Sequence, residues 1–171
     1  LKAIFEQASV GIVRTDLQAV IQQANARFLD IVGRAEEDVI GRPVTDFIHP
    51  DDIPIARKVL NEVPSRPTSG WQVENRYIRP DGEDVQTLVN IRVLHEDDGP
   101  AYGLIGVVAD ITETRRAKAE LSEIRHSLRV AANAIPVPLW MTHPDRSGRF
   151  ANNAYLAFTG QQLDEVTADD W

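Results

Sequence analysis

Hydrophobic and polar positions alternate with a period of two between residues 71 and 111, which is the spacing of β-strands. Along the middle of this stretch every second side chain is β-branched, and these residues are Val85, Thr87, Val89, Ile91 and Val93. Two turn-forming segments, 79–82 and 97–100, divide the stretch into three parts. The pattern predicts three long antiparallel strands whose apolar face packs against helices of the same domain.

Shorter patterns precede these strands. Apolar residues at helical spacing over residues 1–8 predict a leading helix, and the runs 11–16 and 19–23 predict a β-hairpin. Asn25 stands where it can cap a following helix, and Gly33 stands where a left-handed residue can end that helix. The N-terminal half is therefore expected to consist of a hairpin followed by short helices.

A long helix is predicted after the last strand. Asp110 can cap its start and Pro136 ends it. Apolar residues recur along it at intervals of 4, 3, 4, 3 and 4 residues, and they are Ala117, Leu121, Ile124, Leu128, Ala131 and Ile135. Charged residues crowd the positions between them, as in a two-stranded coiled coil. We expect a homodimer whose seam is Ala117, Leu121, Ile124, Leu128 and Ala131; the alternative is that the helix folds back onto its own sheet.

The chain repeats part of itself 127 residues later. Residues 24–29 resemble residues 151–156, and Gly33 matches Gly160 at the same offset without a gap. Because the chain begins with Leu and its second copy is incomplete, we expect a piece of a longer protein. The expected organisation is a domain over 1–111 that includes the leading helix 1–8, a linker helix over 112–135, and a truncated second copy over 136–171.

The composition excludes several classes of function. The chain has 171 residues, of which 43% are hydrophobic and 26% charged, the balance of a soluble globular protein. Its net charge of -8 disfavours nucleic acid as a partner, because both surfaces are negative. No apolar run approaches the roughly 20 residues that span a bilayer, so we expect a cytoplasmic location. The absence of cysteine excludes disulfides, thiolate metal sites and a cysteine nucleophile.

Several separated motifs together resemble the PAS domain with its C-terminal PAC portion, followed by the start of a second PAS domain, as in tandem-PAS bacterial sensor proteins. The motifs are residues 11–16, the spacing of Asn25, Phe28 and Gly33, residues 39–42, residues 49–52, Glu74 and Arg76 before Asp81 and Gly82, and residues 106–112. The resemblance implies an α+β fold with a five-stranded antiparallel sheet and helices on one face around a small cavity. It also implies a sensory role, in which the junction at Asp110 and Thr112 drives the following helix.

An aliphatic inner sheet face would line that cavity together with two phenylalanines. The candidate ligand-binding residues are Val13, Thr15, Phe28, Phe47, Tyr77, Thr87, Val89, Ile91, Leu104 and Val108. The alternative is that these residues pack against one another and leave no room for a ligand. Glu74 and Arg76 share one strand face and either bind a charged effector or form surface ion pairs.

The residues do not favour a familiar cofactor, so the cofactor is left open. A photochemical flavin adduct needs a cysteine, which is absent, and the amide positions of a flavin site fall on Tyr77, Thr87 and Val108. A haem would need an axial ligand near the helix that follows His49, and that helix holds no further histidine. No metal site is predicted.

No catalytic constellation is recognisable, because the four histidines are scattered and no nucleophile motif is present. We therefore expect a non-enzymatic sensory module of a bacterial signal-transduction protein, such as a two-component system. It would sense a small ligand or a partner and act through the dimeric linker on a histidine kinase or cyclic-dinucleotide effector domain outside this chain. The alternative is a ligand-free structural spacer and dimerisation module.

Overall fold

The computed structural model describes residues 2–63, 70–96, 99–142 and 149–160 of the chain. The chain forms two compact units, Leu1–Arg115 and Arg116–Trp171. The elements of the first unit are α1 (Lys2–Glu6), β1 (Gly11–Thr15), β2 (Ile21–Ala24), α2 (Ala26–Val32), α3 (Glu36–Val39), the 3-10 turns η1 (Val44–Phe47) and η2 (Pro50–Asp52), α4 (Ile53–Glu62), β3 (Trp71–Ile78), β4 (Asp84–His95) and β5 (Ala101–Asp110). Helix α5 (Thr112–Ala134) begins in the first unit and continues in the second.

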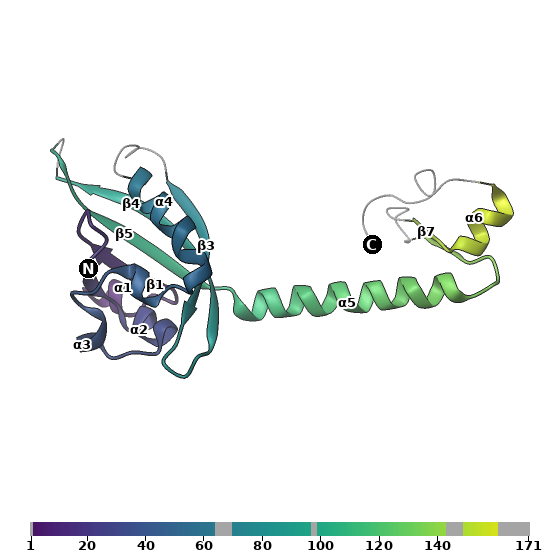
Figure 1. The fold of residues 1–171 in the computed structure, drawn as a ribbon, viewed down its shortest axis with the longest axis horizontal. Helices are drawn as coiled ribbons and strands as arrows, with labels where there is room; N and C mark the ends of the chain where they lie inside the picture. The colour runs from purple at the N-terminus through teal and green to yellow at the C-terminus, as the bar shows by residue number, and fades with distance from the viewer. Residues whose placement is uncertain (1, 64–69, 97–98, 143–148, 161–171) are drawn as a thin grey trace. The chain divides into compact units, whose positions relative to one another are not determined.

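The first unit contains a five-stranded antiparallel sheet, as the resemblance implied (Figure 1). Its strand order is β2-β1-β5-β4-β3. The three long strands 71–111 form one side of this sheet, and the hairpin β1–β2 completes it because β1 pairs with β5. Helices α2, α3 and α4 pack against one face of the sheet, which is the arrangement that the resemblance implied.

The period-two pattern of β4 divides the sheet into an inner and an outer face. Val85, Thr87, Val89 and Ile91 are buried, whereas Asn90 between them is exposed. Phe28 from α2 and Phe47 from η1 are fully buried against this inner face. Burial of an aliphatic or aromatic side chain contributes about 1.5–3 kcal/mol, so this shared core holds the helices on the sheet.

The predicted helix ends lie where the sequence placed them. Asn25 caps α2 by accepting a hydrogen bond from the backbone N–H of Phe28 at 2.9 Å. Gly33 ends the same helix with a φ of 64°, a left-handed conformation that a side chain disfavours.

The second unit holds the rest of α5, a two-stranded sheet of β6 (Trp140–Thr142) and β7 (Arg149–Ala151), and helix α6 (Asn153–Thr159). Asn152 caps α6 and Gly160 ends it with a φ of 71°. These two residues stand 127 positions after Asn25 and Gly33, so the sequence repeat is also a repeat of local structure.

Strand β5 passes very close to the end of β1 at Gly103. A Cβ atom at this position would lie 2.4 Å from the carbonyl oxygen of Thr15, and a backbone oxygen in a sheet cannot move away. We expect Gly103→Ala to lower the free energy of unfolding of the first unit by about 1–3 kcal/mol, the usual cost of overpacking. Urea denaturation, monitored through the NMR signals of residues in the sheet, would measure this loss of stability.

Gly70→Ala is the matched control. The nearest atoms to a Cβ there belong to the Arg92 guanidinium, at 3.6 Å, which is ordinary van der Waals contact. The same methyl group should therefore change stability by less than about 0.5 kcal/mol. Equal effects of the two substitutions would contradict the close approach.

Candidate functional site

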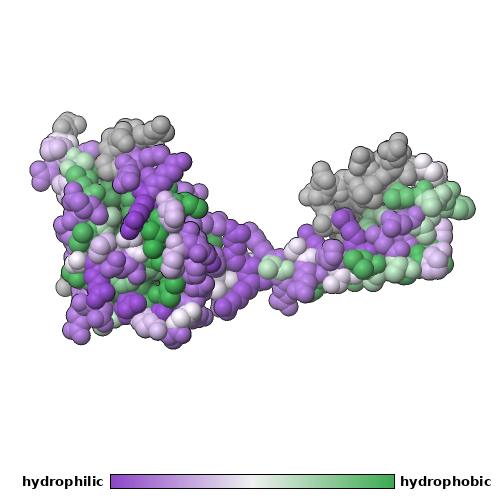
Figure 2. Space-filling view, viewed as in Figure 1, coloured by the Kyte–Doolittle hydropathy of each residue, from purple (hydrophilic) through white to green (hydrophobic). Residues whose placement is uncertain are grey.

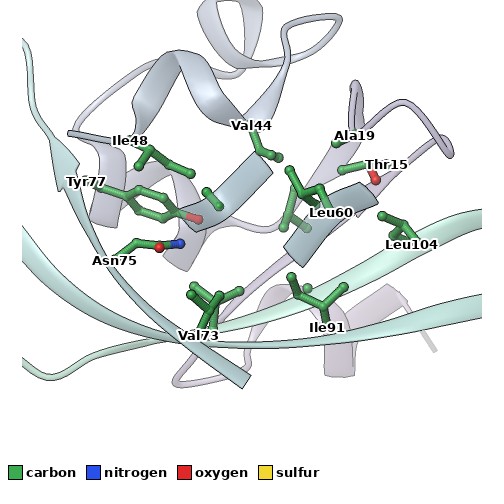
Figure 3. A pocket seen from close by; sticks show the side chains of 14 residues that line it. Thr15, Ala19, Val44, Ile48, Leu60, Val73, Asn75, Tyr77, Ile91 and Leu104 are labelled. Carbon is green, nitrogen blue, oxygen red and sulfur yellow. The ribbon is translucent and has the colours of Figure 1, made fainter. Parts of the chain in front are cut away.

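A cavity of about 40 Å³ lies between the inner face of the sheet and the segment that runs from η1 to α4 (Figure 3). Its wall is mostly aliphatic and is formed by Val13, Thr15, Ala19, Val44, Ile48, Ala56, Leu60, Val73, Asn75, Tyr77, Val89, Ile91, Leu104 and Gly106. A cavity needs a volume of roughly 10–15 Å³ to hold one water molecule. The cavity as it stands therefore accommodates only a few non-hydrogen atoms.

The structure brings six of the ten candidate ligand-binding residues to this wall, namely Val13, Thr15, Tyr77, Val89, Ile91 and Leu104. The other four, Phe28, Phe47, Thr87 and Val108, are buried in the core behind it. Phe28 meets the ring of Tyr77 edge-on, with ring centres 6.0 Å apart, and Thr87 donates its hydroxyl to the backbone carbonyl of Asn75 at 2.9 Å. Phe28 thus contacts a side chain that lines the cavity, and Thr87 holds the backbone of another lining residue.

Asn75 is the functional candidate that the sequence analysis missed. Its side chain is 5% exposed, and its Oδ1 atom is buried with no hydrogen-bond partner among the described residues. Figure 3 shows its carboxamide and the hydroxyl of Tyr77 on the same side of the cavity. Asn75 lies two positions before Tyr77 on β3, so the strand alternation that placed Tyr77 inward could also have placed Asn75 there.

The chemistry of the wall is neutral. Burial raises the pKa of the Tyr77 hydroxyl above its ordinary value, which keeps it protonated. The Thr15 hydroxyl donates a hydrogen bond to the backbone carbonyl of Asp16 at 2.8 Å, and its oxygen can still accept one. Since none of the residues that line the cavity is charged, an ionised ligand would lose its hydration without gaining a counter-charge.

The segment from η1 to α4 (residues 44–62) covers the cavity, and we call it the cavity cover. An ion pair holds this cover on β3. The Arg76 guanidinium donates to both carboxylate oxygens of Asp52, at 3.0 and 2.8 Å, and the Arg76 backbone N–H donates to the same carboxylate at 2.8 Å. The backbone N–H of His49 donates to the carbonyl of Arg76 at 2.8 Å, and Ile48 pairs with Tyr77. The Arg76 hydrogen bonds hold the pKa of Asp52 below its ordinary value, and those of Asp52 raise the pKa of Arg76.

Glu74 and Arg76 serve different contacts although they share one face of β3. Arg76 pairs with Asp52, whereas Glu74 pairs with Arg115 in the first turn of α5. Each residue is thus engaged in an ion pair with another part of the first unit, whereas binding of a charged effector stays a prediction.

The junction between β5 and α5 is fixed by backbone and side-chain hydrogen bonds. Asp110 Oδ1 accepts from the backbone N–H of Thr112 at 3.0 Å, which caps the helix start. The backbone N–H of Gln86 on β4 donates to the Thr112 hydroxyl oxygen at 3.0 Å, and the Gln86 carbonyl accepts from Ile111 at 2.8 Å. With the Glu74–Arg115 ion pair, residues of β3 and β4 both contact the first turn of α5.

The predicted seam is exposed along α5. Leu121 and Ile124 are each 50% exposed and Leu128 is 60% exposed. Figure 2 shows hydrophilic side chains at the start of α5 and apolar ones along its second half. Within the described part of the second unit these side chains therefore keep much of their apolar surface in solvent.

Two kinds of site are absent from the described residues. No three His, Asp or Glu side chains there come together as metal ligands would. Among the same residues, none of the helices combines the length and hydropathy needed to cross a membrane.

Known proteins resemble this chain in sequence and in structure. The family described as PAS domain matches residues 9–113. The chain is 23% identical over 127 residues to the sensor histidine kinase TmoS of Ectopseudomonas mendocina, and 29% identical over 122 residues to the C4-dicarboxylate transport sensor protein DctS of Rhodobacter capsulatus. These matches cover 74% and 68% of this chain but only 13% and 18% of the relatives.

A solved PAS domain of a protein from Colwellia psychrerythraea has the same fold, with a TM-score of 0.59 and 26% sequence identity. The match covers 66% of this chain and 94% of that one. One PAS domain is thus matched in the first unit, and the start of a second one at the end of the chain stays a prediction.

The Asp52–Arg76 pair predicts a specific effect of acid. Because the pKa of Asp52 is lower in the folded than in the unfolded chain, its stabilisation is complete above the unfolded pKa of about 3.9. It is lost as the pH falls through the folded pKa. We expect Asp52→Asn to lower the free energy of unfolding at pH 7 by about 1 kcal/mol, given a bidentate but partly solvated pair. The difference from the wild type should vanish in strong acid, as measured by urea denaturation across pH.

Asp51→Asn provides the matched control, since Asp51 is 72% exposed and contacts Arg76 through a single hydrogen bond of 3.3 Å. Its effect at pH 7 should be less than half as large. An Asp52→Asn effect that persisted unchanged in strong acid would contradict the ion pair as its cause.

Proposed function

The chain belongs to the PAS domain family, and we propose that its first unit is the sensory input module of a longer signalling protein. The buried, unpartnered Oδ1 of Asn75 at the cavity wall is the observation that carries the proposal. An unsatisfied buried acceptor costs about 1–3 kcal/mol, and a ligand in the cavity with an N–H or O–H group would supply the missing donor. Homology to sensor histidine kinases supports the sensory role, and the chain is proposed to sense rather than catalyse.

The proposed ligand is a small neutral molecule with a short apolar part and one hydroxyl or amide group. Its N–H or O–H would donate to Asn75, and the Tyr77 hydroxyl lies on the same side to bind an acceptor. The aliphatic wall formed by Val13, Val89 and Ile91 suits the apolar part.

The proposed output is helix α5, through the junction at Asp110 and Thr112. Strand β3 carries Asn75 and Tyr77 on its inner face and Glu74 on its outer face. A ligand that shifts β3 would therefore also shift the Glu74–Arg115 ion pair at the start of the helix.

Two further elements complete the proposal. The seam of α5 would pair with a second copy of the chain in a homodimer, because an isolated helix with an exposed apolar stripe is marginal in water. Residues 136–171 would begin a second PAS domain, and the cap at Asn152 with the left-handed Gly160 supports this. The effector that reads the signal and a cytoplasmic location are part of the same proposal.

A structural spacer is the second candidate, and the small size of the cavity favours it. In that case the aliphatic wall would simply be a slightly underpacked core, and no small molecule would bind with measurable affinity.

Binding of short neutral compounds separates the two candidates. We expect 1-propanol and propionamide to bind with millimolar affinity and propionate to fail, because the wall holds no counter-charge. In NMR titrations the shifted amide signals should belong to Val13, Tyr77 and Ile91. Asn75→Leu should weaken binding of the neutral compounds about tenfold, the worth of one hydrogen bond. It should also stabilise the ligand-free chain, because it removes the buried acceptor.

Asn90→Leu serves as the control, since Asn90 is exposed on the opposite face of β4, and it should leave binding unchanged. The absence of saturable shifts at the cavity with every compound would reject the ligand and leave the spacer.

The homodimer has its own test. We expect the double variant Leu121→Asp, Leu128→Asp to sediment as a monomer while the first unit remains folded, because like charges would face each other across the seam. The control is Ala119→Asp with Val130→Asp, two exposed positions about half a turn away on α5. Analytical ultracentrifugation that gave the same mass for the wild type and the seam variant would contradict the dimer.

A further inference from the structure

Two asparagines 127 positions apart are the only fully buried asparagines among the described residues, and both are almost saturated with hydrogen bonds. Asn25 Oδ1 accepts from the backbone N–H of Ile12 at 2.8 Å and from that of Phe28 at 2.9 Å. Its Nδ2 donates to the carbonyls of Phe5 at 2.9 Å and Val10 at 3.0 Å. One side chain thus ties the end of α1 to the start of β1 and to α2.

Asn152 makes the same set of bonds in the second unit. Its Oδ1 accepts from the N–H groups of Leu139 and Tyr155, each at 2.9 Å. Its Nδ2 donates to the carbonyls of Ala132 at 3.0 Å and Val137 at 2.9 Å, and also to that of Ile135 at 3.2 Å. The residues equivalent to Phe5, Val10, Ile12 and Phe28 are Ala132, Val137, Leu139 and Tyr155, every one at the offset of 127.

A side chain of the preceding helix also accepts a hydrogen bond from the backbone N–H of the residue that follows each asparagine. Glu6 Oε2 accepts from the backbone N–H of Ala26 at 3.4 Å, and Asn133 Oδ1 accepts from that of Asn153 at 3.0 Å. Glu6 and Asn133 are again 127 positions apart although they are different residue types. The short helix α1 therefore occupies the place in the first unit that the last turn of α5 occupies in the second.

We propose that Asn25 and Asn152 are positioning residues that form sockets for the end of a helix, and that α5 acts on the second unit through the Asn152 socket. A helix end leaves its last carbonyls without partners inside the helix. The socket donates to one carbonyl of the helix, that of Phe5 or Ala132, and to carbonyls just beyond the helix end. The two acceptor bonds of the same side chain come from backbone N–H groups at the following strand and helix. Movement of the helix end must then either break these bonds or move the strand and helix with it.

The contact between Asn152 and the end of α5 is inferred from the hydrogen bonds alone, whereas its role in signalling rests on the proposed function. It is testable in the ligand-free chain, so failure of ligand binding at the cavity and failure of the socket are separate results.

The substitution Asn152→Asp separates the two halves of the socket. A carboxylate keeps both acceptor bonds, from Leu139 and Tyr155, but it cannot donate to the carbonyl of Ala132 in α5 or to those just beyond the helix end. We expect hydrogen exchange of the 171-residue chain, followed by mass spectrometry, to become at least about tenfold faster in residues 128–137. Exchange in α6 should stay within about twofold, because its cap is retained. A role confined to capping α6 would leave residues 128–137 unchanged.

Asn25→Asp should behave in the same way in the first unit. Residues 2–10 should exchange at least about tenfold faster while α2 keeps its protection. Asn90→Asp adds the same charge at an exposed position and should change neither region.

Unchanged exchange at the helix end in Asn152→Asp, or an equal loss of protection in α6, would overturn the proposal. If the buried charge prevents the second unit from folding, Asn133→Ala decides instead. This variant removes the helix-side bond to Asn153 and leaves Asn152 intact, so exchange in residues 128–137 should rise about threefold. No rise in that variant would equally overturn the socket.

Discussion

The apolar inner face of the five-stranded sheet is the constraint on which the rest of the first unit depends. Helices α2 to α4 are short, and helices of this length are not stable in water by themselves. They persist because Phe28 and Phe47 are buried against the β-branched residues of β4. The same burial fixes the register of the strands, since a slip by one residue would turn Glu74 and Arg76 into the core.

Once the register is fixed, the polar residues that face inward need hydrogen-bond partners, and two buried asparagines show opposite outcomes. Asn25 makes four hydrogen bonds and joins three segments of backbone. Asn75 has a buried oxygen without a partner among the described residues. A saturated buried amide rigidifies a fold, whereas an unsatisfied one lowers its stability. The first pattern holds the fold together, and the second is the one on which the proposed binding site depends.

Local sequence patterns predicted the strands and the helix ends, but they could not predict contacts between residues far apart in the sequence. The strand alternation, the cap at Asn25 and the left-handed Gly33 each depend on residues a few positions apart, so the sequence alone contained the signal. The cavity cover did not follow from it, because Val44 lies in a short 3-10 turn and Ile48 follows that turn, so neither belongs to a segment with a period. For the same reason Asn25 was predicted only as a cap: its bond to Phe5 joins residues 20 positions apart.

The alternation of β3 explains how one strand contacts both the cavity and the first turn of α5. Consecutive residues 74 to 77 point alternately outward and inward, so Asn75 and Tyr77 face the cavity while Glu74 and Arg76 form ion pairs outside it. Arg76 holds the cover through Asp52, and Glu74 holds the first turn of α5 through Arg115. Since a strand is stiff along its length, a displacement at Asn75 reaches both ion pairs together. In the proposed function, this shared strand would link opening of the cavity to the position of the first turn of α5 without any bond that runs directly between the two sites.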